Sequence, residues 1–391
     1  MDTDFSQLDE RLGELEADGY LLDADGTDPN QQYLSGFDAP DPFLTLYAGD
    51  VHLFFPRSLE FGRAKRESDA ESVERYVDYD YDRLREEFDR REATDRVRAA
   101  FLAAHDVEHL VVPPRFPTGA ADGLREQGVT VSVDYDDVIE SVRATKTETE
   151  IEHVRTAQRA NERAMAAAEE LIRGASVDSE RRLIHDGDVL TSERVREEIE
   201  VTLLRNGCAL DETIVACGAD AADPHDRGSG PLLADEPIIV DIFPQDKATK
   251  YHADMTRTFL VGEPSETIQE WFDLTNEARA AAIDAVEPGV TGEAVHDVVC
   301  DIYEDAGFAT LRSDGSTETG FIHTTGHGVG LAVHEQPSIG PGGDELEPGH
   351  VITIEPGLYD PAVGGVRIED FLVVTETGAE NLTDYPISLV E

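Results

Sequence analysis

The chain has 391 residues and carries 84 acidic against 32 basic side chains, which gives a formal net charge of −52. A nucleic-acid-binding protein needs a basic surface to neutralise phosphates, and an anionic membrane would repel this chain, so neither partner is expected. Disorder is not expected either, because 40% of the residues are hydrophobic and they fall into patterned segments. The composition therefore predicts a folded protein with an acidic surface.

Further features of the sequence indicate the setting in which the protein works. Four basic residues are lysines and 28 are arginines, and an acidic, lysine-poor surface suits concentrated salt, where charges are screened within about 3 Å at 1 M. The N-terminus lacks the basic start and apolar segment of a signal peptide, and no apolar run approaches the roughly 18 residues of a membrane span. The scattered cysteines form no metal-binding or disulfide pattern. We therefore expect a cytoplasmic protein, from a salt-loving cell.

Residues 1–145 predict a small α/β domain. A turn sequence, Ala48-Gly49-Asp50, separates two apolar runs and indicates a β-hairpin. The predicted elements are strands at 43–47 and 51–55, a helix near 82–104, a strand at 110–112, a helix at 120–126 and a strand at 129–133. Nothing in this part has the spacing of a catalytic motif.

Several histidines along the whole chain, such as His52, His105, His153 and His296, are interpreted as ordinary structural side chains.

Residues 146–391 predict a second domain that begins with a helix-capping box. Thr147 is followed three residues later by Glu150, and apolar residues then recur on one helical face as far as Gly174. The predicted elements are helices at 147–174 and 193–205, strands at 213–217, 238–243 and 254–261, helices at 266–286 and 293–306, and strands at 351–355 and 365–375. The repeated order of helices and strands predicts an internal duplication about a pseudo-two-fold axis.

Each half of this domain ends in a pair of strands with acidic residues where a strand should be apolar. Asp241 ends one apolar run and Asp254 follows 13 residues later, while Glu355 ends another and Glu369 follows after 14. If the halves are related by symmetry, four carboxylates meet at the axis, where they repel one another unless cations are bound. Oxygen ligands with one imidazole suit manganese, cobalt or zinc, and bridging carboxylates favour two ions about 3.5–4 Å apart.

A histidine that completes such a site lies before the second carboxylate pair. His327 stands among glycines in the segment Thr325–Gly330, where the backbone can approach closely. Each feature alone has an ordinary explanation, since an acid that ends a strand is often a cap and a histidine between glycines is often part of a turn. The glycines also imitate a nucleotide-binding loop, but the strand–turn–helix context is missing. The paired placement of acids in both halves favours the metal site.

The five residues resemble the metal ligands of the pita-bread metallopeptidases, which include Xaa-Pro dipeptidase (prolidase), aminopeptidase P and methionine aminopeptidase. They occur in the family's order over about residues 147–391, within segments such as Ala253–Thr258 and Ile354–Tyr359. The segment Tyr33–Phe37 resembles the N-terminal domain of prolidases and aminopeptidase P, which methionine aminopeptidases lack. The resemblance implies an α/β chain with a creatinase/prolidase-type domain at 1–145 and a pita-bread (creatinase/aminopeptidase) catalytic domain at 146–391.

The resemblance also implies a role for each residue. Asp241 binds one metal ion, His327 and Glu355 bind the other, and Asp254 and Glu369 bridge both. A hydroxide held between the two ions is the nucleophile, because bound ions lower the pKa of water toward neutrality. Glu355 acts as the general base and returns a proton to the leaving nitrogen.

Three more histidines fit the family's pattern. His225 precedes Asp241 by 16 residues, His323 precedes His327 by four, and His334 belongs to the sequence His-Glu-Gln-Pro. All three are expected to contact substrate, and His334 is also a candidate catalytic residue, because an imidazole can donate to a carbonyl oxygen that becomes negative or bind a substrate carboxylate. The alternative for each is a structural histidine.

Arg367 favours one branch of the family. Prolidases and aminopeptidase P have Arg-x-Glu at this place, whereas methionine aminopeptidases usually have Gln-x-Glu. A guanidinium can hold a carboxylate bidentately, so Arg367 is expected at the substrate site, although it could instead neutralise Asp370 or another acid.

The chain departs from the family's pattern between Asp241 and Asp254, where the hairpin is two residues longer. An even insertion keeps both acids on one face.

The leading hypothesis is a dinuclear metallopeptidase that cleaves the bond before proline, as an Xaa-Pro dipeptidase or Xaa-Pro aminopeptidase. Two alternatives stay open: a non-catalytic peptide-binding module, although such modules typically lose ligands, and a creatinase-like hydrolase. Two divalent ions per chain are expected, with manganese first and cobalt or zinc possible. The expected partners are short proline-containing peptides and, by resemblance, a second copy of the chain in a homodimer.

Overall fold

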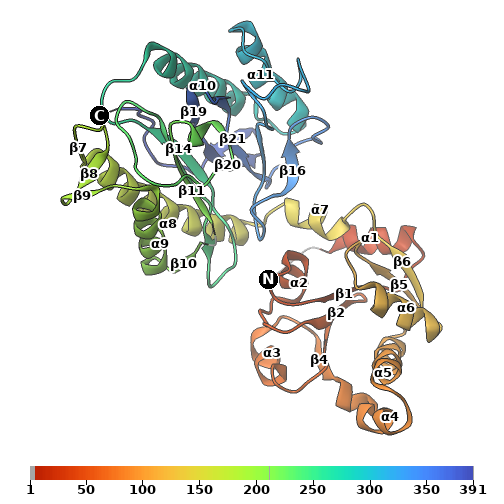
Figure 1. The fold of residues 1–391 in the computed structure, drawn as a ribbon. Coiled ribbons are helices and arrows are strands. Elements are labelled where there is room, and N and C mark those ends of the chain that lie inside the picture. Colours follow the sequence, from red (N-terminus) through yellow and green to blue (C-terminus); the bar gives the residue numbers. More distant parts are fainter. Residues whose placement is uncertain (1–4, 211, 391) are drawn as a thin grey trace. The chain divides into compact units, whose positions relative to one another are not determined.

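The computed structural model describes residues 5–210 and 212–390, which fall into two compact units, Met1–Arg143 and Ala144–Glu391 (Figure 1). The predicted domain boundary after residue 145 lies close to this division. Each unit is described by itself below.

The first unit is built on a six-stranded sheet with the order β4-β3-β2-β1-β5-β6. Strand β2 pairs with β1 and with β3 in antiparallel fashion. The other three pairs, β3 with β4, β1 with β5 and β5 with β6, are parallel. The elements of this unit are α1 (Ser6–Glu14), β1 (Gly19–Ala24), α2 (Pro29–Ser35), β2 (Phe43–Tyr47), β3 (Val51–Phe55), α3 (Phe61–Glu67), β4 (Ser72–Arg75), η1 (Tyr76–Tyr79), α4 (Tyr81–Glu87), α5 (Arg90–Ala104), β5 (His109–Val112), α6 (Thr118–Glu126), β6 (Thr130–Val133) and α7 (Val138–Ala144).

Helices cover both faces of this sheet, because successive side chains of a strand point to opposite faces. In β1, Leu21 packs into a core with residues of α5 and α6, while Tyr20 and Leu22 pack into another with residues of α1, α2 and α7. The strand is therefore apolar on both sides, and alternation of polar and apolar residues could not mark it in the sequence.

The predicted hairpin is confirmed, with Leu46 opposite His52 across the turn. The single helix predicted near 82–104 is wrong, because α4 ends at Glu87 and α5 begins at Arg90. Asp89 makes the break: its side chain accepts a hydrogen bond from the Glu92 backbone nitrogen at 3.0 Å and so caps α5.

The second unit consists of two halves that each place a pair of helices against an antiparallel sheet. The first half contains α8 (Glu148–Arg173), β7 (Ser176–Val177), β8 (Leu183–His185), β9 (Asp188–Val189), α9 (Ser192–Arg205), β10 (Cys208–Ala209), β11 (Thr213–Cys217), η2 (Asp220–Ala222), β12 (Ile238–Ile242), β13 (Gln245–Asp246) and β14 (Met255–Phe259). The second half contains α10 (Glu266–Ala285), α11 (Gly292–Asp305), β15 (Gly326–Gly328), β16 (Glu335–Ile339), β17 (Val351–Ile354), β18 (Gly357–Asp360), β19 (Gly364–Arg367), β20 (Asp370–Thr375) and β21 (Gly378–Asn381).

The sheets of the two halves follow one plan. The first has the order β11-β12-β14, and the second, β16-β15-β17-β20-β21, contains the same arrangement in β15-β17-β20. The helices α8 and α9 share a core with the first sheet, and α10 and α11 share another with the second. The order expected from an internal duplication is thus present, with β12 corresponding to β17 and β14 to β20.

The capping box predicted at the start of α8 is confirmed. Glu150 accepts from the Thr147 backbone nitrogen at 2.8 Å, and the Thr147 hydroxyl caps the helix in return. The continuous strand predicted at 365–375 is wrong, because Ile368 and Glu369 separate β19 from β20. The Glu369 backbone nitrogen instead donates to the Thr256 carbonyl oxygen at 3.1 Å, so this residue joins the second half to β14.

Candidate active site

All nine residues predicted for the site line one cavity of 810 Å³ in the second unit. Strands, strand ends and loops of both halves contribute to the lining. This agrees with the expectation that corresponding positions of the two sheets meet at one place. The nine residues are Asp241, Asp254, His327, Glu355, Glu369, His225, His323, His334 and Arg367. Residues up to 144 positions apart in the chain, His225 and Glu369, therefore share a single concave site.

The first carboxylate pair is set by the register of β12 and β14. Asp241 lies in β12 opposite Thr256, and Asp254 lies two residues before Thr256, just ahead of β14. Residues two apart on an extended strand face the same side, so both carboxylates point to the same face of the sheet. Both side chains are buried.

The second carboxylate pair occupies corresponding places in the other half. Glu355 follows the last residue of β17, and Glu369 precedes the first residue of β20. The Thr256 hydroxyl donates to Oε2 of Glu369 at 2.8 Å. A residue of the first half thereby orients a carboxylate of the second.

His327 reaches the carboxylates from β15, and close backbone packing sets its position. A Cβ atom on Gly326 would come within 2.0 Å of the Thr353 carbonyl oxygen, and one on Gly328 within 2.1 Å of the Gln336 carbonyl oxygen, so side chains are excluded at both positions. Nδ1 of His327 lies 3.1 Å from the Gly328 carbonyl oxygen and donates to it. This leaves the lone pair on Nε2, which lies 3.4 Å from Oε1 of Glu355 and 3.9 Å from Oδ2 of Asp254.

The proximity of the acids changes their protonation. Burial, reinforced by the Asp241 charge, raises the pKa of Glu355 to about 8. Burial and neighbouring carboxylates also raise the pKa values of Asp254 and Glu369 well above their ordinary ranges. Burial and the nearby His334 lower the pKa of His327 to about 4, so its imidazole is neutral. The positively charged side chains near these acids are thus too few for all of the carboxyl groups to ionise.

The donor set fits divalent metal ions. Asp254, His327 and Glu369 each offer a ligand atom within 4.8 Å of the others. Oδ1 of Asp241 is buried and has no hydrogen-bond partner within residues 5–210 and 212–390. A neutral imidazole, an unsatisfied carboxylate oxygen and acids that need positive charge are what hard or borderline divalent ions bind.

Arg367 holds a carboxylate of the cluster rather than Asp370. Its Nη2 donates to Oδ2 of Asp241 at 2.7 Å, and its Nη1 donates to the Tyr359 hydroxyl at 3.0 Å. Asp370 is paired with Arg257 and Arg279 instead. The Arg367 side chain is only 3% exposed, and its donors are directed to protein groups.

The three predicted substrate histidines differ in their surroundings. Both ring nitrogens of His323 are engaged: Nδ1 donates to the Thr324 carbonyl oxygen at 2.7 Å, and Nε2 lies 2.9 Å from the Tyr359 hydroxyl. Burial, with the nearby Arg367 charge, lowers the pKa of His323 to about 3, so this imidazole accepts from the tyrosine. His225 and His334 are exposed at the cavity, and the ring of His334 lies 4.3 Å from that of His327.

Sequence reasoning missed the hydroxyl groups that hold these residues. Thr256 orients Glu369, the Thr353 hydroxyl accepts from the His327 backbone nitrogen at 3.1 Å, and Tyr359 links Arg367 to His323. Thr256 and Tyr359 lie in segments that carry the family resemblance, and this was the available signal. Their partners come from distant parts of the chain, so spacing alone could not assign them a role.

The lengthened hairpin between Asp241 and Asp254 forms a defined structure. Strand β13 pairs with β10, and Oδ1 of Asp246 accepts from the backbone nitrogens of Ala248 and Thr249 at 3.0 and 2.8 Å. The extra residues are therefore taken up in a side hairpin, and the register between β12 and β14 is unbroken.

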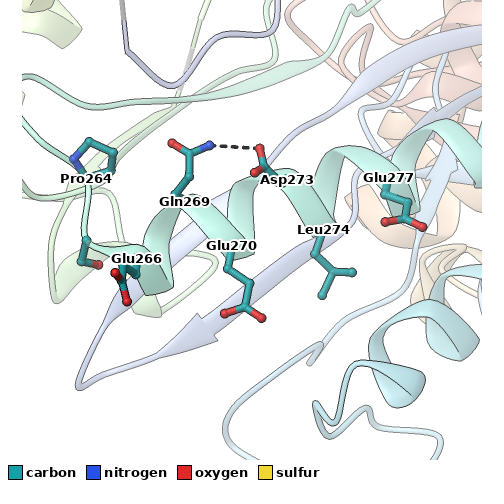
Figure 2. A pocket seen from close by; sticks show the side chains of 8 residues that line it. Pro264, Glu266, Gln269, Glu270, Asp273, Leu274 and Glu277 are labelled. Atoms are coloured by element: carbon teal, nitrogen blue, oxygen red, sulfur yellow. Dashed lines mark hydrogen bonds between the residues drawn. The ribbon is translucent and has the colours of Figure 1, made fainter.

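A second hollow lies away from this site along α10 (Figure 2). Figure 2 shows side chains from successive turns of this one helix, with a hydrogen bond between Gln269 and Asp273. Half of its eight lining residues are acidic, namely Glu266, Glu270, Asp273 and Glu277. It is an example of the charged surface expected from the composition.

Comparison with known proteins identifies the class that this fold and site define. Residues 152–376, more than half of the chain, match the profile of "Metallopeptidase family M24", and residues 5–145 match "Creatinase/Prolidase N-terminal domain". The chain therefore belongs to metallopeptidase family M24, whose members use divalent metal ions, typically two. The predicted α/β chain with a creatinase-type domain before a pita-bread domain is confirmed.

Individual relatives cover different shares of the chain. The Xaa-Pro dipeptidase of Pyrococcus horikoshii is 29% identical over 361 residues, 91% of this chain and 90% of that protein. The probable dipeptidase PepE of Mycobacterium tuberculosis is 34% identical over 256 residues, which span 65% of this chain and 62% of PepE. The crystal structure of the prolidase from Pyrococcus horikoshii OT3 superimposes with a TM-score of 0.79 at 27% identity, covering 98% of this chain and 99% of that one. In the described ranges, no helix is both long and apolar enough to cross a membrane.

Proposed function

We propose that this chain is a metal-dependent exopeptidase that hydrolyses the peptide bond before proline in short peptides. The observation that carries the proposal is the convergence of four carboxylates and one neutral imidazole in a single cavity beside exposed histidines. Relatives named Xaa-Pro dipeptidase, which align over 91% and 63% of the chain, support the choice of substrate. The Arg-x-Glu sequence at 367–369 and the N-terminal unit support it as well.

Two divalent ions would be held by Asp241, Asp254, His327, Glu355 and Glu369. We propose manganese as the first choice, because the donors are mainly carboxylate oxygens, with cobalt or zinc as substitutes. When bound, the ions would lower the pKa of water, so that a nucleophile forms near neutral pH, and would stabilise negative charge on the scissile carbonyl.

The remaining chemistry belongs to side chains of the protein. Glu355 is the most exposed of the four carboxylates, at 17%, and would accept a proton from the attacking water and deliver it to the leaving proline nitrogen. His334 and His225, exposed at the cavity, would donate hydrogen bonds to the scissile carbonyl oxygen or to a substrate carboxylate.

Arg367 and His323 have a different role in this proposal from direct substrate contact. Arg367 positions Asp241, and Tyr359 connects this guanidinium to His323. Because both nitrogens of His323 are used within the protein, this residue would shape the cavity wall beside the substrate. Both residues are therefore assigned as positioning residues.

A non-catalytic peptide-binding module is the second candidate, since the fold alone does not determine activity. The complete ligand set argues against it, because a binding module gains nothing from five buried or half-buried groups that cost free energy unless ions are bound. A homodimer and a cytoplasmic location stay predictions of the sequence.

The function is tested by the Glu355→Gln variant. Removal of the proposed general base should lower hydrolysis of Gly-Pro, and of a longer peptide with proline second, by at least about 100-fold. Glu347→Gln, which changes an exposed acid before the other end of β17, is the matched control and should keep full activity. Full activity of the Glu355 variant with retained ions would reject the assignment, and the preferred substrate length would distinguish a dipeptidase from an aminopeptidase.

A further inference from the structure

A group of potential metal ligands lies in the first unit, among residues that we interpreted from sequence as structural. His52, Glu74 and His105 each offer a ligand atom, and these atoms lie within 4.8 Å of one another. We propose that they form a second metal-ion site, for a divalent transition ion of the zinc class. The proposal is independent of the peptidase site in the second unit.

The sheet brings two of these residues to one face. Strands β3 and β4 run in parallel, with His52 opposite Ser72 and Phe54 opposite Glu74. Because alternate residues of a strand face the same side, all four side chains point to the face on which α5 packs. The register of the edge strand β4 thus places Glu74 beside His52.

The third residue, His105, directly follows the end of helix α5, and a stack of aromatic rings places it. Phe101 lies over Phe54, with ring centroids 4.2 Å apart and planes 5° from parallel. His105 follows Phe101 by four residues, one helical turn, and the two rings are in contact. This packing brings the His105 ring to 4.0 Å from that of His52. The position of the second imidazole is therefore set by the hydrophobic core.

Hydrogen bonds hold the prospective ligand atoms together. Nε2 of His105 lies 2.9 Å from Oε1 of Glu74, and the Ser72 hydroxyl lies 2.7 Å from the same oxygen and 3.0 Å from Nδ1 of His52. The Tyr79 hydroxyl donates to the other oxygen of Glu74. Zinc bonds of about 2.0–2.1 Å in a tetrahedron place neighbouring ligand atoms about 3.3 Å apart. An ion would thus enter after small side-chain shifts, with the proton between Nε2 of His105 and Glu74 released or moved to Nδ1 of the ring.

The charges of the group suit a cation. Burial and the neighbouring His105 ring lower the pKa of His52, so this imidazole is in the neutral form that binds metals. Burial opposes ionisation of Glu74, but hydrogen bonds from Tyr79, Ser72 and His105 together lower its pKa below the ordinary value. Asp50 and Glu71 add negative charge near His52. Two imidazoles and one carboxylate are a common zinc ligand set.

An ordinary ion pair between His105 and Glu74 explains only part of this arrangement. It does not require the second imidazole, whose ring centroid lies 4.0 Å from that of the first. The side chains of His105 and Glu74 are 16% and 22% exposed, which leaves access for an ion and a completing water ligand. A bound ion would join the edge strand β4 to β3 and to the end of α5.

The experiment compares ion content of the full chain with that of the His52→Gln/His105→Gln variant after equilibration with zinc and dialysis. We expect one zinc ion fewer per chain in the variant, whatever number the peptidase site holds. The control is His109→Gln, which changes a histidine of β5 that binds Ser132 and the Glu16 carbonyl oxygen. It should retain the full ion content.

A second measurement covers the case in which the double variant does not fold. Zinc is titrated into the unaltered chain, and the imidazole signals are followed by NMR. We expect the signals of His52 and His105 to shift together. This shift should take up one equivalent of zinc in addition to the zinc that binds to the second unit. Equal ion content in the folded variant and the unaltered chain, or imidazole signals of His52 and His105 that do not respond to zinc, would overturn the proposal.

Discussion

The main conflict among single residues of this protein is that buried acids lie together without enough positive charge. Arg367 neutralises Asp241, while Glu355, Asp254 and Glu369 keep raised pKa values. Because these acids have raised pKa values, we expect the stability of the site and its affinity for ions to depend on pH.

The first prediction is that ions stabilise the protein more strongly as the pH rises. The folded pKa of Glu355, about 8, exceeds its ordinary 4.5, so without ions the fold is favoured while the carboxyl is protonated. This contribution is full below about pH 4.5 and is lost as the pH rises through about 8. Bound ions supply the positive charge that the proton on Glu355 otherwise supplies, so the fold no longer loses stability as the pH rises.

The measurement is the difference in melting temperature with and without manganese between pH 5 and 8. We expect this difference to widen with pH, and calorimetry in buffers of different ionisation enthalpy should detect proton release on ion binding. The Glu355→Gln variant, which lacks one titrating group, should show a shallower trend. A difference that stays constant across this range would contradict the account of the buried acids.

Among the secondary-structure elements, the junction of the two halves of the second unit depends on a buried charge cluster. Asp370, at the start of β20, pairs with Arg257 of β14 at 2.9 Å and with Arg279 of α10, and it is only 3% exposed. An acid of the second half thus binds arginines from both halves, directly beside Glu369.

Asp370→Asn should therefore destabilise the fold strongly. Loss of one partner leaves buried guanidinium charge uncompensated, which costs roughly 3 to 5 kcal/mol of unfolding free energy. The control is Glu380→Gln, which breaks the exposed pair with Arg155 and should cost less than about 1 kcal/mol. Urea unfolding of the ion-free variants measures both, and equal losses would show that the junction does not depend on the cluster.

Elements with local signals were predictable, and those set by distant contacts were not. The capping box at Thr147 marked α8, and apolar runs that end in acids marked β12 and β17. The break between β19 and β20 had no local signal, because the Glu369 backbone leaves the strand to bond Thr256 of the other half. The same holds for His52 and His105, which are brought together only by the packing of α5 on the sheet.

At the scale of the whole molecule, the net charge of −52 is mostly a property of the surface. The acidic side chains along α10 are one example (Figure 2). We propose that four carboxylates of the candidate active site and their ions carry the function. Most of the remaining acids lie on the surface and affect how salt changes the stability of the fold.

We predict that the protein is less stable in dilute buffer than in concentrated salt. Repulsion between surface carboxylates acts over about 10 Å at 0.1 M salt but only about 3 Å at 1 M, so salt removes a cost of folding. Urea unfolding in low and high potassium chloride measures the effect, with sorbitol at matched osmolality as the uncharged control. Equal stability at both salt concentrations would contradict the prediction of a salt-adapted surface.

The proposed activity is tested most directly by the rate of Gly-Pro hydrolysis before and after removal of metal ions. We expect no turnover after chelation, recovery when manganese is restored, and slower hydrolysis of Gly-Ala under the same conditions. Undiminished hydrolysis by the ion-free protein, or equal rates for Gly-Pro and Gly-Ala, would contradict the conclusion that this chain is a metal-dependent, proline-directed exopeptidase.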